Sequence, residues 1–113
     1  MKTFNNLEEM KPYYNKKTNT YEFFENGEII DIHINFILKT TKSICAKNIN
    51  ASNIKAWDIY AKDIDAWKID AVDIKICEVC DASETFVCKI IKCSEENAKY
   101  FCLDSDVVIK QDM

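Results

Sequence analysis

The hydrophobic positions between residues 44 and 79 recur at a strict interval of five residues. The first column is isoleucine: Ile44, Ile49, Ile54, Ile59, Ile64, Ile69 and Ile74. The second column follows two residues later and is alanine except at its last member: Ala46, Ala51, Ala56, Ala61, Ala66, Ala71 and Ile76. From residue 48 on, the position before the isoleucine is mostly Asp or Asn: Asn48, Asn53, Asp58, Asp63 and Asp73, with Lys68 as the exception. Such a period fits neither an α-helix nor a plain β-strand and favours a chain that makes a short straight step and then turns.

Each five-residue unit has the chemistry of a short strand followed by a corner. Residues two apart point the same way on an extended segment, so the isoleucine and the alanine share one face. Isoleucine suits an extended backbone, whereas Asp and Asn tolerate turns. We therefore expect a β-solenoid whose stacked coils bury both columns, because one unit cannot bury its own face. An amphipathic helix is the alternative, but residues five apart sweep around a helix instead of forming a stripe.

This repeat resembles that of the pentapeptide-repeat family, whose members form right-handed, four-sided β-helices with one repeat on each side. The likeness covers 44–79, and Ile29 and Ile34 keep the same phase. In that family a small residue precedes the large aliphatic residue, whereas here alanine follows isoleucine. The resemblance implies a mainly all-β fold, a short right-handed solenoid of fewer than two coils. Such runs also look like those of small proteins from low-GC bacteria and their phages.

A solenoid this short needs its open ends covered, because an exposed coil end invites association. The chain is therefore expected to be a single domain of 113 residues with two irregular caps. Its predicted parts are an N-terminal cap with a hairpin over 1–43, the repeats over 44–79 and a cysteine-rich C-terminal cap over 80–113.

Local signals predict a few elements inside the caps. Asn26-Gly27 predicts a hairpin turn, and the alternation of apolar and polar residues over 30–36 predicts a strand. In the second cap, a serine followed by acidic residues predicts a short helix over 94–101. Three apolar β-formers predict a last strand at 107–109.

The composition narrows the classes of protein to consider. The chain has fifteen lysines and no arginine, a net charge of −4, and no apolar run long enough to span a membrane. Because the sequence shows no signal-peptide pattern, we expect a cytoplasmic protein, which would lie in the host cytoplasm if a phage encodes it. A mildly acidic chain without arginine is a poor direct binder of nucleic acid, and no membrane contact is expected. The expected partner is a protein, and the expected state is a monomer or a homodimer.

Six cysteines are many for an intracellular chain, and four have the spacing of metal ligands. Cys77 and Cys80 form a C-x2-C, Cys88 and Cys93 form a C-x4-C, and Cys102 could replace one of them. If the five-residue phase continued past the repeats, no cysteine would fall on an inward column. Four close thiolates suit a structural zinc that closes one coil end. Ordinary buried thiols are a nearly equal alternative, and disulfide or redox chemistry is a weaker one.

The sequence shows no convergent catalytic set, so the chain is expected not to be an enzyme. His33 is the single histidine and falls on an outward position of an alternating strand, where a surface role is expected. One glycine cannot make a Gly-rich phosphate loop, and no Ser/His/Asp arrangement is present. The carboxylates recur with the five-residue repeat. We therefore interpret them as residues that favour its corners and not as acid–base pairs.

Aromatic residues on the repeats are candidate anchors for a partner. Trp57 and Trp67 lie ten residues apart at one phase, outside the two inward columns, and Tyr60 is also outward. Exposed Trp and Tyr are enriched at binding hot spots. Together with nearby acids they make the predicted partner-binding set: Trp57, Trp67, Tyr60, Asp63, Asp65 and Asp70. Packing of the tryptophans beneath the aromatic N-terminal segment is the alternative.

Two functions of different classes fit a rigid rod without an active site. The first is an inhibitor: the pentapeptide-repeat family includes acidic β-helices that bind DNA gyrase by resembling duplex DNA. A small acidic phage protein also suits an anti-CRISPR role, in which it blocks nucleic-acid loading by the effector nuclease. Lysines nearly balance the aspartates of the repeats, which favours specific protein contact over charge mimicry. The second function is structural, a solenoid that stacks end to end in a phage or cell assembly, and oligomeric state separates the two.

Overall fold

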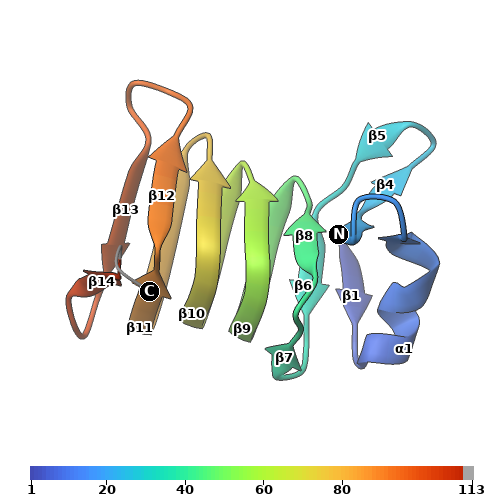
Figure 1. Ribbon diagram of the computed structural model, residues 1–113, viewed down its shortest axis with the longest axis horizontal. Helices are drawn as coiled ribbons and strands as arrows, with labels where there is room; N and C mark the ends of the chain where they lie inside the picture. The colour runs from blue at the N-terminus through green and yellow to red at the C-terminus, as the bar shows by residue number, and fades with distance from the viewer. Residues whose placement is uncertain (111–113) are drawn as a thin grey trace.

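The computed structural model describes residues 1–110, which wind into a right-handed β-solenoid of about five turns (Figure 1). The helical elements are a short helix and a 3-10 turn: α1 (Leu7–Met10) and η1 (Lys11–Tyr13). The first strands are β1 (Lys2–Phe4), β2 (Tyr14–Asn15), β3 (Thr20–Glu22), β4 (Phe24–Glu25), β5 (Glu28–Ile29), β6 (Ile32–Ile34), β7 (Leu38–Lys39) and β8 (Ser43–Cys45). The later strands are β9 (Asn48–Ala61), β10 (Asp63–Ile76), β11 (Val79–Cys88), β12 (Ile90–Cys93), β13 (Lys99–Cys102) and β14 (Val107–Ile109).

The strand register shows that three repeats, not four, complete one coil. Strands β9 and β10 run parallel around successive coils, with Ile64 beside Ile49, a step of fifteen residues. The same step places Ile59 beside Ile44. The rod is therefore three-sided, and its about five turns replace the four-sided solenoid of fewer than two coils implied by the pentapeptide-repeat resemblance.

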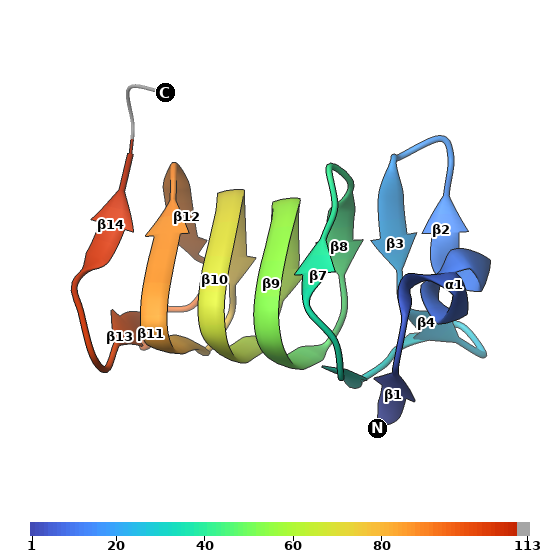
Figure 2. The same cartoon turned by 90° about the horizontal axis from the view of Figure 1, so that it is seen from below.

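We name the three sides A, B and C by the residues that stack on them. Side A consists of 32–34, 48–51, 63–66, 79–82 and 99–102. Side B consists of 38–39, 53–56, 68–71, 85–88 and 107–109. Side C consists of 20–22, 43–45, 58–61, 73–76 and 90–93. Figure 2 shows the stack of coils from below, with the helical end opposite β13 and β14.

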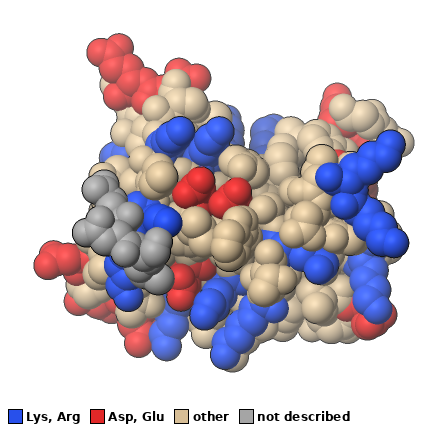
Figure 3. All heavy atoms as spheres, viewed as in Figure 1, with Lys and Arg blue, Asp and Glu red and all other residues tan. Residues whose placement is uncertain are grey.

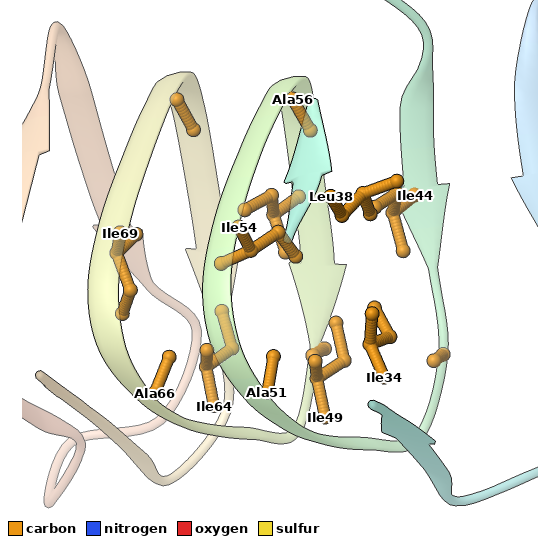
Figure 4. Packing of buried hydrophobic residues seen from close by; sticks show 14 of the residues in the cluster. Ile34, Leu38, Ile44, Ile49, Ala51, Ile54, Ala56, Ile64, Ala66 and Ile69 are labelled. Carbon is orange, nitrogen blue, oxygen red and sulfur yellow. The ribbon is translucent and has the colours of Figure 1, made fainter. Parts of the chain in front are cut away.

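The predicted isoleucine and alanine columns form the core. Figure 4 shows Ile49, Ile54, Ile64 and Ile69 pointing into the coil, with alanines beside them. Each of these isoleucines is at most 2% exposed, and burying such a side chain stabilises the fold by about 1.5–3 kcal/mol. The columns are therefore the main source of stability along the rod.

The Asp/Asn column links one coil to the next. Oδ1 of Asp63 accepts a 2.8 Å hydrogen bond from the backbone N–H of Val79 in the next coil. Nδ2 of Asn48 donates a 2.9 Å hydrogen bond to Oδ1 of Asp31 in the preceding coil. These side chains thus satisfy polar groups between coils, in addition to favouring the corners.

The solenoid continues past residue 79, because two corners each take one extra residue. Cys80 lies beside Ile64, a step of sixteen residues, and Phe86 lies beside Ile69, a step of seventeen. These insertions restore the inward phase for Cys80 and for Cys88. The five-residue phase therefore does not continue unbroken past residue 79, and two cysteines fall on inward positions.

The local elements predicted inside the caps are confirmed except for one helix. The hairpin is confirmed: β4 pairs with β5 around Asn26 and Gly27, whose φ angles of 53° and 78° suit a tight two-residue turn. The strands at 32–34 and 107–109 are confirmed as β6 and β14. The helix over 94–101 is wrong, because 99–102 pairs with β11 as the next strand of side A.

The N-terminal end is closed by side chains. Phe4, Met10 and Phe23 are fully buried there, and the rings of Phe4 and Phe23 lie 5.1 Å apart. The short strand β2 adds an antiparallel edge to β3. Within residues 1–110, no helix is long and apolar enough to cross a membrane.

Candidate functional site

The two tryptophans lie on different edges of the rod. Trp57 falls at the corner between sides B and C, and Trp67 at the corner between sides A and B of the next coil. Ten residues correspond to two of three sides, so equal phase in the repeat does not mean a shared face. The side chains of Trp57 and Trp67 are 55% and 57% exposed, so they do not pack beneath the N-terminal segment.

The other predicted contact residues are also distributed over all three sides. Tyr60 is outward on side C, Asp63 and Asp65 lie on side A, and Asp70 is outward on side B. Asp70 faces Lys55 of the preceding coil, with Oδ2 and Nζ 4.0 Å apart. The structure therefore does not bring the predicted partner-binding set together as one patch.

Coiling sorts the charges that seemed balanced along the sequence. Side A carries three aspartates and no lysine over its ranges from 32 to 82: Asp63, Asp65 and Asp81. Side B collects lysines at its outward and corner positions: Lys39, Lys55, Lys68 and Lys89. A near-neutral body thus has an acidic side and a lysine-rich side.

Asp81 is the most perturbed carboxyl group of side A. It lies beside Asp65 in the register, and its pKa is raised to about 6. Burial is the largest cause, followed by the hydrogen bond and charge of Asp65 and the charge of Asp63. At neutral pH this side therefore carries mutually repelling carboxylates.

The predicted zinc ligands are dispersed. Cys80 and Cys88 are buried in the core, Cys93 is exposed at the coil end, and Cys77 lies at a corner where Oγ of Ser94 donates to its Sγ at 3.2 Å. Burial raises the pKa of Cys80 and raises that of Cys88 to about 11, so both thiols are protonated at neutral pH. Among residues 1–110, no three Cys, His, Asp or Glu side chains form a group that could hold a metal. Zinc binding therefore stays a prediction from the sequence, and residues 1–110 do not form a ligand cluster that would support it.

A broad hollow lies along the edge between sides C and A, and we call it the saddle. One wall is Ile29 of the β4–β5 hairpin, and the other is the loop 94–97 between β12 and β13. Its volume is about 990 Å³, and it is open to solvent. Figure 3 shows it as the dip at the top of the molecule, between two projecting parts.

The floor of the saddle combines aromatic, apolar and charged groups. Nζ of Lys75 lies 5.5 Å from the ring centroid of Tyr60, a cation–π contact. Nζ of Lys62 lies 3.4 Å from Oε1 of Glu78. Lys47 and the buried Ile76 complete this floor. A rigid trough of this kind can hold an extended segment by apolar contact and by hydrogen bonds from lysine.

The sequence contained a signal for the saddle that depends on the coil length. Lys47 and Lys62 are fifteen residues apart, as are Tyr60 and Lys75, and in a three-sided coil such residues are neighbours. The walls come from segments more than sixty residues apart in sequence. Of the predicted contact residues, Tyr60 belongs to the saddle.

Comparisons with known proteins suggest no function, so the proposed function rests on the geometry of the site. No protein family, no curated protein and no solved structure matches this chain.

Proposed function

We propose that this chain is a non-enzymatic protein-binding inhibitor that holds a segment of its partner in the saddle. The observation that carries the proposal is a concave, open site between two projecting walls on a rigid rod. A buried isoleucine core fixes the floor, so little ordering entropy is lost when a partner binds.

The chemistry of the saddle favours a protein segment over a small molecule. The trough is open to solvent, whereas small-molecule sites enclose most of the ligand. Tyr60 offers an amphipathic ring and Lys75 a cation on a long apolar stem, both typical of contact with a peptide chain. Three lysines and three glutamates line the trough, which favours a segment that carries charges of both signs.

The proposed partner class is a nucleic-acid-processing enzyme such as a CRISPR effector nuclease. Binding would block the loading of nucleic acid. This part of the proposal is supported by the resemblance of the repeats to a family that includes such inhibitors, and by the small acidic chain.

A second candidate, a DNA-mimicking gyrase binder, is supported by the acidic side A. Asp63, Asp65 and Asp81 form a row on adjacent coils, with no lysine between them. In this case the partner would contact side A instead of the saddle.

Binding measurements with charge-changing variants separate the two candidates. The probes are a purified CRISPR effector nuclease and purified DNA gyrase, each titrated with the protein in a calorimeter. If the saddle binds, Tyr60→Ala with Lys75→Glu weakens binding by at least about tenfold, as expected for the loss of hot-spot contacts. If side A binds, Asp63→Asn with Asp65→Asn weakens it instead.

Lys39→Glu, an exposed change on side B, is the matched control and should leave binding unchanged. Circular dichroism of each variant verifies folding. Binding that no saddle or side A variant affects would refute both sites, and no binding to either probe would refute the proposed partner class.

A further inference from the structure

The C-terminal end of the rod exposes the side chains that continue the inward columns. Tyr100 lies beside Cys80 and Ile109 beside Cys88. Cys80 and Cys88 are at most 1% exposed, but Tyr100 and Ile109 are 39% and 38% exposed. In the described chain, no further coil covers them. This end is therefore an apolar mouth with strand edges around it.

Strand β14 forms part of that rim and has one free edge. Within residues 1–110 it pairs with β11 alone, so its other edge presents unpaired backbone groups. Native edges are usually protected by lysine, proline or a bulge, but β14 is Val107-Val108-Ile109. The edge can therefore accept another strand.

The sequence around β14 is complementary to itself. An antiparallel pair centred on Val108 places Asp106 of one strand opposite Lys110 of the other, and the reverse. These residues lie two positions on either side of Val108, so the charges share its outward face. Opposite charges across an antiparallel pair stabilise it, whereas like charges oppose it.

The other end of the rod has no open apolar mouth, although its strands β1 and β2 also pair on one edge only within residues 1–110. Phe4, Met10 and Phe23 fill it and α1 lies at this end (Figure 1), so the apolar mouth of one copy meets no apolar mouth on the head of the next. A twofold axis through β14 instead joins two identical ends and makes a closed contact.

We propose that the C-terminal end binds the C-terminal end of a second copy, through antiparallel pairing of the two β14 strands. The contact brings the two apolar mouths together and shields Tyr100 and Ile109. The inference does not rest on the proposed function, because the saddle opens on an edge along the rod.

Charge reversal across the twofold tests this pairing. Sedimentation velocity of the full chain should show twice the monomer mass of 13.2 kDa at high concentration. Asp106→Lys places like charges opposite each other twice and should weaken the dimer about tenfold. Asp106→Lys combined with Lys110→Asp exchanges the charges and should restore it. Both positions are exposed, so neither change threatens folding.

Two further variants complete the test. Val108→Lys at the centre of the pair should give a monomer, while Asp70→Lys on side B, the matched charge reversal, should leave the dimer intact. A wild-type monomer at all concentrations would overturn the proposal, as would a ladder of higher oligomers. A dimer that ignores Val108→Lys, or a double exchange that fails to rescue Asp106→Lys, would also overturn it.

Discussion

At the N-terminal end, Phe4, Met10 and Phe23 close the coil completely, whereas at the C-terminal end Tyr100 and Ile109 continue the inward columns and stay more than a third exposed. Both ends terminate the same stack of sides. The N-terminal segment contains large aromatic rings and a helical turn that can fold across the triangle. The C-terminal segment continues the strands of sides A and B instead.

This difference shows what stops a repeat protein from associating. Continuing the coil only moves the exposed edge outward, because each new strand creates another. Folding a non-repeating segment across the axis removes the exposed interior. Predictions that separate the two ends therefore test the architecture more sharply than changes in its middle.

The largest expected effect comes from placing a carboxylate at each end. Met10→Asp buries an unpaired charge in the closed end and should lower the free energy of unfolding by about 3–5 kcal/mol. Leu103→Asp, at a side chain 68% exposed near the open end, should change it by less than about 0.5 kcal/mol. Urea unfolding of dilute protein gives both values. Equal losses for the two variants would mean that both ends are closed.

A smaller effect is expected from Asp81 in the coil next to the open end. Its pKa is raised to about 6, so the protonated form stabilises the fold below the ordinary pKa of 3.8, and this contribution is lost as pH rises through about 6. Asp81→Asn should therefore melt higher than the wild type at pH above 7 and equally near pH 4. Because the carboxyl is partly exposed, we expect a gain of about 1 kcal/mol.

The pH profile of melting temperature measures this difference, with Asp104→Asn as the exposed control. A variant that gains stability equally at all pH values would rule out the carboxylate repulsion on side A.

The smallest effect concerns chemical reactivity, with no change in stability. Cys93 at the open end should react with iodoacetamide in the native state, whereas Cys80 and Cys88 should react only after unfolding. Raised pKa values slow the two buried thiols further. Mass spectrometry of digests after timed labelling gives the three rates. Rapid native labelling of Cys80 would show that the last coil is not packed.

The sequence was sufficient to predict which residues face the interior of the coil. It was not sufficient to predict how many sides complete one coil. Ile64 and Ala66 had to point inward together, because spacing of two fixes direction on any extended segment. A five-residue repeat is compatible with three sides or four, and only the pairing of Ile64 with Ile49 decides. The turn at Asn26-Gly27 was predictable because its chemistry is local.

Most of the candidate site could not be predicted from the sequence, for two physical reasons. Grouping of Lys47 with Lys62, and of Tyr60 with Lys75, depends on the coil length. The phase of Cys80 and Phe86 depends on single-residue insertions at corners, which leave no mark in composition. Both are properties of stacking, which local propensity does not encode.

The fifteen-residue coil also makes the distance between the walls of the saddle adjustable in fixed increments. Inserting one complete coil of fifteen residues after residue 62 would move the hairpin and the loop 94–97 apart by about 4.8 Å while both stay on the same edge. Removing a single repeat would instead rotate the loop by one side and separate it from the hairpin. Relatives that differ by whole coils would then present the same trough in graded widths, so that tandem duplication could change partner size without altering a contact residue.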